Sequence, residues 1–121
     1  MTAPDRPRFG PGPARLLVDG RDVAALAVAD TRASRNRGLL GTSAVDGALW
    51  ITKCPTVHMV GMRYPIDVAV LDRRGRVLKV ATLRPWTGMT WPRLRASVTV
   101  EAAAGSMEAW QVRRGSVLEV G

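Results

Sequence analysis

Residues 66–83, IDVAVLDRRGRVLKVATL, predict two β-strands joined by a tight turn, and this hairpin decides the fold class. Residues 66–72 and 76–83 are rich in valine, leucine and alanine, whereas Arg73–Gly75 between them is polar and ends in glycine. Two apolar runs separated by three residues that include a glycine are typical of an antiparallel hairpin. This stretch therefore indicates a fold built on antiparallel sheet.

Six further segments have the composition of short strands, and turn residues separate them. They are residues 15–18, 23–29, 47–51, 56–60, 97–101 and 117–120. Asp19-Gly20 favours a second hairpin, and residues 31–38 and 106–112 predict a short helix and a helical turn. The pattern predicts a mainly β fold, either a β-sandwich or a partly open barrel of short, mostly antiparallel strands, with one or two short helices.

The domain organisation follows from where proline and glycine gather. Residues 1–13 contain four prolines and two glycines, so we expect a mobile, disordered arm. Residues 14–121 are predicted to form a single β-rich domain, with a long loop at 85–92.

Arginine dominates the charge of the chain, because Lys53 and Lys79 are the only lysines among 18 basic residues and the net charge is +8. The single cysteine, Cys54, excludes an internal disulfide framework. No apolar run approaches the roughly 20 residues that span a bilayer, and the N-terminus lacks the apolar core of a signal peptide. We therefore expect a basic, cytoplasmic protein.

Five segments carry a resemblance to a known family. They are Ala29–Leu40 with its Arg35 and Arg37–Leu40, Gly47–Trp50, His58–Asp67, Leu71–Val77, and Val100–Gly105. In this order and spacing they resemble the domain-of-unknown-function 192 family of bacteria and archaea, also called the uncharacterised ancient conserved region family. His58 stands where that family has tryptophan. The resemblance implies a compact, mainly β, uncharacterised bacterial protein, and it implies no reaction.

Asp67 is the first candidate functional residue. It shares a strand face with Ala69 and Leu71, because successive side chains of a strand point to opposite sides. Burial of a carboxylate is costly unless it is hydrogen-bonded or paired. Asp67 is therefore interpreted as a pocket acid or cation anchor, or as a structural residue that binds backbone N–H groups of the Met62–Pro65 turn or pairs with Arg35.

Glu101 and His58 complete the set of candidate catalytic residues. Glu101 shares a face with Thr99 and is expected to meet Arg35 or Arg37 as a buried pair. His58 is the only histidine, and as a general base it needs a carboxylate such as Asp67 or Glu101 to orient it. A candidate ligand pocket is accordingly assigned to Arg35, His58, Met62, Asp67 and Glu101.

A soft-metal site is considered and set aside. Cys54, His58, Met59 and Met62 offer thiolate, imidazole and thioether ligands. In an extended strand, however, about 13 Å separates Cys54 from His58, which is too far for one ion. We expect no metal site and no cofactor.

Trp86 and Trp91 lie in the loop rich in proline and glycine. Exposed, they are candidate anchors for a partner, and packed, they close one end of the fold. The arginines recur in predicted turns and helix ends, without a recognised nucleic-acid motif, so specific nucleic-acid binding is not expected.

Three function classes remain open. The leading hypothesis is a non-enzymatic binding or accessory module with a pocket near residues 58–67, acting on an unknown small molecule or protein partner. The alternatives are a small enzyme that uses Asp67, Glu101 or His58 as acid or base, and a binder of polyanions or nucleic acid through arginine-rich turns.

Overall fold

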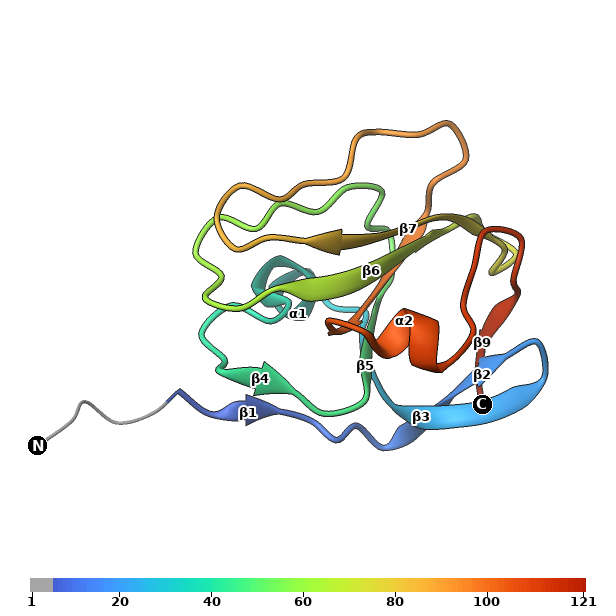
Figure 1. The fold of residues 1–121 in the computed structure, drawn as a ribbon, viewed down its shortest axis with the longest axis horizontal. Coiled ribbons are helices and arrows are strands. Elements are labelled where there is room, and N and C mark those ends of the chain that lie inside the picture. Colours follow the sequence, from blue (N-terminus) through green and yellow to red (C-terminus); the bar gives the residue numbers. More distant parts are fainter. Residues whose placement is uncertain (1–5) are drawn as a thin grey trace, which may run out of the picture.

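Seven strands form one curled sheet in the computed structural model, which describes residues 6–121 (Figure 1). They are β2 Ala14–Val18, β3 Arg21–Ala29, β5 Ala48–Ile51, β6 Ile66–Leu71, β7 Val77–Leu83, β8 Val98–Ala103 and β9 Leu118–Val120. Their order is β7-β6-β8-β5-β3-β2-β9, and only β3 and β5 pair in parallel. The prediction of a mainly β fold of short, mostly antiparallel strands is confirmed.

The predicted hairpin is β6 and β7. All six residues of β6 are buried, because β7 and β8 flank this strand and both faces of the sheet are covered. In the connecting turn, the Asp72 carboxylate accepts hydrogen bonds from the N–H groups of Arg74 and Arg76 at 2.8 and 3.0 Å. Gly75 takes a φ of 83°, a conformation that residues with a side chain rarely adopt.

A second hairpin joins β2 and β3 through Asp19-Gly20, whose φ angles of 49° and 82° are those of the predicted two-residue turn. The chain then crosses to β5 through α1, Arg32–Arg37, as a parallel neighbour requires. The Thr31 hydroxyl accepts a hydrogen bond from Ser34 N–H, and the Ser34 hydroxyl accepts one from Thr31 N–H. This local capping box begins α1 where it was predicted.

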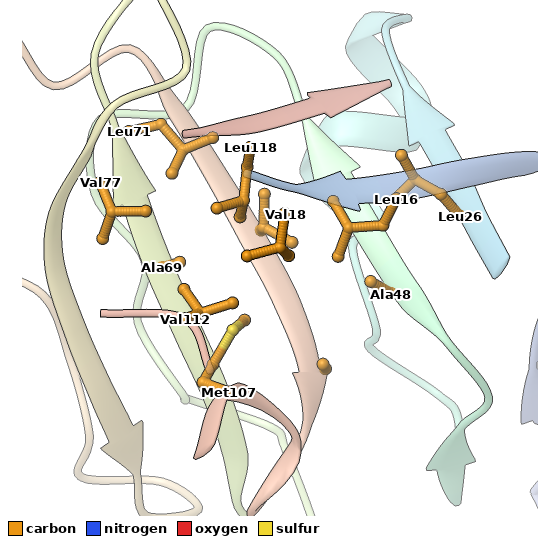
Figure 2. Close-up of a cluster of buried hydrophobic side chains, with 12 residues drawn as sticks. Leu16, Val18, Leu26, Ala48, Ala69, Leu71, Val77, Met107, Val112 and Leu118 are labelled. Atoms are coloured by element: carbon orange, nitrogen blue, oxygen red, sulfur yellow. The ribbon is translucent and has the colours of Figure 1, made fainter. Parts of the chain in front are cut away.

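The sheet curls until its two edge strands meet at one end. Arg76, just before β7, bridges Val117, just before β9, and Val77 N–H donates to the Ser116 carbonyl at 2.8 Å. Every strand of the sheet contributes to the cluster of buried side chains inside this curl (Figure 2). Met107 of α2, Ser106–Ala109, packs into the same cluster. Of the two predicted architectures, β-sandwich and partly open barrel, the structure therefore has the second.

A second apolar cluster covers the outer face of the sheet. Its buried side chains include Leu49, Ile51 and Val68 from the strands, with Leu39 after α1 and Met59 from the loop before β6. Among the described residues, neither helix is long and apolar enough to cross a membrane. The sheet thus has a core on each side, and α1 and α2 lie on opposite faces.

Two sequence-based expectations differ from the structure. Residues 56–60 are not a strand, because their partner is the irregular loop after β7: His58 forms only an isolated bridge to Met89. Within the segment expected to be a mobile arm, β1 (Arg8–Phe9) pairs with β4 (Ala44–Val45), and Arg8 forms an ion pair with Asp46. Residues 1–5 of that segment lie outside the described residues.

Candidate functional site

Glu101 stands at the centre of the outer face of the sheet. Strand β8 places it between Leu49 of β5 and Val68 of β6, and only 4% of its surface is exposed. Among residues 6–121, no side chain or backbone N–H forms a hydrogen bond or ion pair with its carboxylate. Burial raises the pKa of Glu101 to about 7, because the charged form loses its hydration without gaining a partner.

The Glu101 carboxyl lines a cavity of about 360 Å³ between α1 and residues 51–62, which we call the Glu101 cavity. Seven apolar side chains line it: Leu39, Leu40, Ile51, Val57, Met59, Met62 and Ile66. Basic side chains line its outer part: Arg32, Arg35, Arg37 and Lys53. Arg35 is half-buried, whereas the other three are exposed. The cavity is therefore apolar in its wall, cationic outside and acidic at its floor.

Local geometry holds the two sides of this cavity apart. On one side, α1 ends at Gly38, and a Cβ built there would lie 3.6 Å from the Glu101 carboxylate. On the other side, Cys54 N–H donates to the Ser97 carbonyl at 2.7 Å, and the Thr99 hydroxyl donates to the Cys54 carbonyl at 2.8 Å. These bonds tie the segment after β5 to β8, so the wall opposite α1 is held from the same strand that carries Glu101.

Four of the five residues assigned to a ligand pocket come together here: Arg35, His58, Met62 and Glu101 all line the Glu101 cavity. His58 lies at its exposed edge, and no carboxylate among the described residues orients its ring. The expected ion pair of Glu101 with Arg35 or Arg37 does not form, since the ion pairs of the described residues are Arg8–Asp46 and Arg15–Asp22. Glu101 therefore has no ion-pair partner among the described residues.

Asp67 lies elsewhere, on the inner face of the sheet. One carboxylate oxygen accepts from the Thr82 hydroxyl at 2.6 Å, and the other accepts from Gly105 and Met107 N–H at 3.0 Å each. Asp67 binds backbone N–H groups, as its structural interpretation expected, but not those that the prediction named, and it also lines a separate cavity with Thr82 and Met107. It holds the start of α2, whereas the prediction named the Met62–Pro65 turn or Arg35. The reason is its strand face, which points away from both.

Residues that the sequence-based prediction missed include Arg32, Lys53 and Cys54, all of which line the Glu101 cavity. Arg32 could have been predicted from the sequence, because it lies three residues before the candidate Arg35 and residues three apart on a helix share a face. Cys54 had none, since its place depends on a turn in which Lys53 takes a φ of 50°. Burial raises the pKa of the Cys54 thiol, which disfavours the thiolate that nucleophilic catalysis needs.

No group of three or more histidine, cysteine, aspartate or glutamate side chains within residues 6–121 is placed to hold a metal ion. Trp86 and Trp91 are exposed, with 59% and 73% of their surfaces accessible, so they do not close an end of the barrel. Of the two alternatives for these residues, exposed or packed, the structure shows the exposed one.

The sequence model of the DUF192 family, described as "Uncharacterized ACR", matches residues 14–120. A crystal structure of a protein of unknown function from Novosphingobium aromaticivorans DSM 12444 is 19% identical with a TM-score of 0.74, over 87% of this chain and 83% of that one. A second, from Sinorhizobium meliloti 1021 and described with a proposed role in transcription regulation, is 18% identical with a TM-score of 0.71, over 88% and 92%. These two likenesses show a shared fold. No curated protein matches the chain.

Proposed function

The chain belongs to the uncharacterised DUF192 family, and we propose that it is a binding module whose Glu101 cavity holds a small organic anion. The observation that carries this proposal is a carboxyl group almost fully buried, without a protein partner, at the floor of an apolar cavity with basic side chains outside. No buried side-chain nitrogen or oxygen of the described residues lacks a hydrogen-bond partner, so the Glu101 oxygens, which have no protein partner, open into the cavity. A ligand seated in the cavity would bond to them directly.

The charge around the cavity supports an anionic ligand. Arg32, Arg35 and Arg37 on α1 are joined by Lys53 from the facing segment, and no acidic side chain other than Glu101 lines the cavity. The guanidinium of arginine binds carboxylate or phosphate through paired hydrogen bonds. The half-buried Arg35 is the best placed of them to hold such a group at the entrance.

The wall and floor set the rest of the ligand. Leucine, isoleucine, valine and methionine side chains favour a carbon skeleton over a sugar or a polyol. Near pH 7 the Glu101 carboxyl exists in both protonation states, so it either donates to a ligand oxygen or accepts from a ligand N–H or O–H. We therefore propose a ligand with one anionic end, an apolar middle and a polar group at the far end.

A thermal-shift series with small aliphatic and aromatic carboxylates and phosphate monoesters tests this proposal. We expect some of these compounds to raise the Tm of the wild-type protein and to lose that effect in R35A, because the entrance arginine is gone. R114A, which removes an exposed arginine distant from the cavity, is the matched control and keeps the effect. If no compound shifts Tm, or if R35A responds like the wild type, the proposal is wrong.

A second candidate function is catalysis with Glu101 as a general acid or base. The observation that favours it is the pKa of about 7, since a group that titrates near the working pH transfers protons most efficiently. Asp67 is less suited to this role because three hydrogen bonds hold it, and His58 lacks an orienting carboxylate among the described residues. Turnover of a cavity ligand by the wild type and not by E101Q is the outcome that separates the enzyme from the binding module.

A further inference from the structure

The loop between β7 and β8 exposes large apolar side chains, and it stands away from the sheet at the top of Figure 1. The exposed fractions are 59% for Trp86, 73% for Trp91 and 89% for Leu94, and Met89 is 46% exposed. Single exposed apolar residues are ordinary, whereas several in one short segment mark an interaction site. We call residues 84–97 the tryptophan loop.

The exposure does not come from a loosely attached segment. Thr90 is buried, its N–H donates to the Val57 carbonyl at 2.8 Å, and its hydroxyl accepts from Val57 N–H at 2.8 Å. Trp86 N–H donates to the Met59 carbonyl at 2.9 Å. Hydrogen bonds at Trp86 and Thr90 thus hold the loop against residues 57–59, while the side chains of Trp86 and Trp91 remain exposed to solvent.

Backbone strain at Trp86 reinforces this point. Trp86 takes a φ of 68°, an unfavourable conformation for a bulky residue that persists only when the surroundings impose it. Gly88 folds back so closely that a Cβ there would lie 2.7 Å from the Arg84 carbonyl oxygen. The turn that presents Trp86 is therefore rigid, and a rigid anchor loses little conformational entropy on binding.

The tryptophan loop and the groove beside its C-terminal end are mainly basic. Residues 84–97 contain Arg84, Arg93 and Arg95 and no aspartate or glutamate. Arg95 also lines a groove of about 940 Å³ with the three arginines of the β6–β7 turn, Arg73, Arg74 and Arg76. The acidic residue of that groove, Asp72, has its carboxylate engaged by two backbone N–H groups of the turn.

From this arrangement we infer that the tryptophan loop docks onto an anionic lipid bilayer, with Trp86, Trp91 and Leu94 in the interfacial layer and the arginines against the headgroups. Tryptophan favours the membrane–water interface, and arginine near an anionic surface adds electrostatic attraction. Nucleic acid would also attract the arginines and stack on the tryptophans. It would gain little from Leu94 and Met89, which are aliphatic and exposed, whereas acyl chains would.

Sedimentation with vesicles tests the inference, using phosphatidylcholine alone and phosphatidylcholine mixed with phosphatidylglycerol. We expect binding only to the mixed vesicles, with a blue shift of tryptophan emission and a loss of binding at high salt. W91A/L94A should weaken binding about tenfold or more with an unchanged Tm, since both side chains are exposed. R74E/R93E should weaken it by a similar factor, because it reverses two charges on this surface.

The matched control is R113E/R114E, which changes the net charge equally at exposed arginines outside the tryptophan loop and its groove, and it should bind like the wild type. Equal binding to both kinds of vesicle, or full binding by W91A/L94A, would overturn the inference. A single-stranded oligonucleotide that binds more tightly than the vesicles and displaces them would overturn it in favour of nucleic acid. Absence of binding to either vesicle would also overturn it.

Discussion

Two buried carboxylates on neighbouring strands, Asp67 and Glu101, have opposite surroundings. They are 3% and 4% exposed, and in the pairing of β6 with β8 Asp67 stands opposite Ala102, next to the Val68–Glu101 pair. Because they lie one position apart in register, they point to opposite faces of the sheet. Asp67 accepts three hydrogen bonds, and Glu101 accepts none among the described residues.

The difference shows how to distinguish a structural carboxylate from a functional candidate. Burial alone does not separate them, and neither does their position in a strand. Asp67 compensates the loss of hydration through Thr82, Gly105 and Met107, so its charge stabilises the fold. Glu101 has no such compensation, and its pKa rises to about 7 for that reason. Glu101 is therefore the carboxylate whose oxygens are not engaged by protein donors.

The helices that cover the two faces repeat the contrast. Thr31 and Ser34 cap α1 within one turn of the chain. The N-cap residue of α2 forms no side-chain hydrogen bond. Instead, the Asp67 carboxylate binds the N–H groups of Gly105 and Met107, which lie 38 and 40 residues away along the chain. The inner face is therefore tied together by a long-range bond, and the outer helix by a local one. Substitution of Asp67, Glu101 and Thr31 tests this difference between the two faces of the sheet.

The largest effect is expected for D67A. It leaves the Thr82 hydroxyl and two backbone N–H groups without their acceptor, so we expect a loss of about 4 kcal/mol in the free energy of unfolding, measured with denaturant. D67N retains one acceptor oxygen and should lose less. The matched control is D22N, whose carboxylate pairs with Arg15 in solvent and should show no measurable change. A D67A protein as stable as the wild type would refute the structural role.

E101Q should produce a stability difference that depends on pH. The pKa of Glu101 is about 7 when folded against 4.5 ordinarily, so the folded state holds its proton more tightly. The wild type therefore loses stability as pH rises from about 4.5 through 7, by about 3 kcal/mol in total. Glutamine is neutral throughout, so E101Q should be the more stable protein above pH 7.

Unfolding of the two proteins by denaturant at a series of pH values measures this difference, and groups common to both cancel. If the stability of E101Q relative to the wild type stays constant from pH 4 to pH 8, Glu101 is not an uncompensated buried carboxyl. In that case the contrast with Asp67 disappears.

T31A should give the smallest of these effects, a loss of about 1 kcal/mol in the free energy of unfolding, because it removes one side of the capping box of α1. S106A removes a hydroxyl from the first turn of α2, where no side-chain cap is formed, and is expected to cost less. A larger loss in S106A than in T31A would show that local capping matters more on the inner face than on the outer one.

Much of the fold follows from local sequence. The β6–β7 hairpin alternates apolar residues around a glycine turn, and α1 carries its own cap and glycine stop, so both were predictable. Residues 56–60 look like a strand by composition, and they fail to become one because the chain that faces them, around Met89, is an irregular loop. Pairing depends on both partners, and a single segment carries information about only one.

In the candidate site, too, local sequence predicted some features, whereas others depend on distant contacts. The alternation within β6 and β8 placed Asp67 with Ala69 and Glu101 with Thr99, and the register of the sheet confirms both faces. It could not say that Gly105 and Met107 would supply donors to one carboxylate while the other received none. Nor could it say that Arg35 would line a cavity with Glu101 without pairing to it.

The sequence by itself determined the strand periodicity, the turns and the cap of α1, because these depend on residues within a few positions of one another. Only the tertiary structure decided which buried carboxylate receives protein hydrogen bonds, since two of the three donors to Asp67 lie 38 and 40 residues away along the chain. It also decided that Trp86 and Trp91 stay exposed, because the hydrogen bonds that hold their loop run to residues 57–59. Contacts between distant parts of the chain, which no local pattern encodes, therefore decide which polar and aromatic side chains are engaged by the protein and which are not.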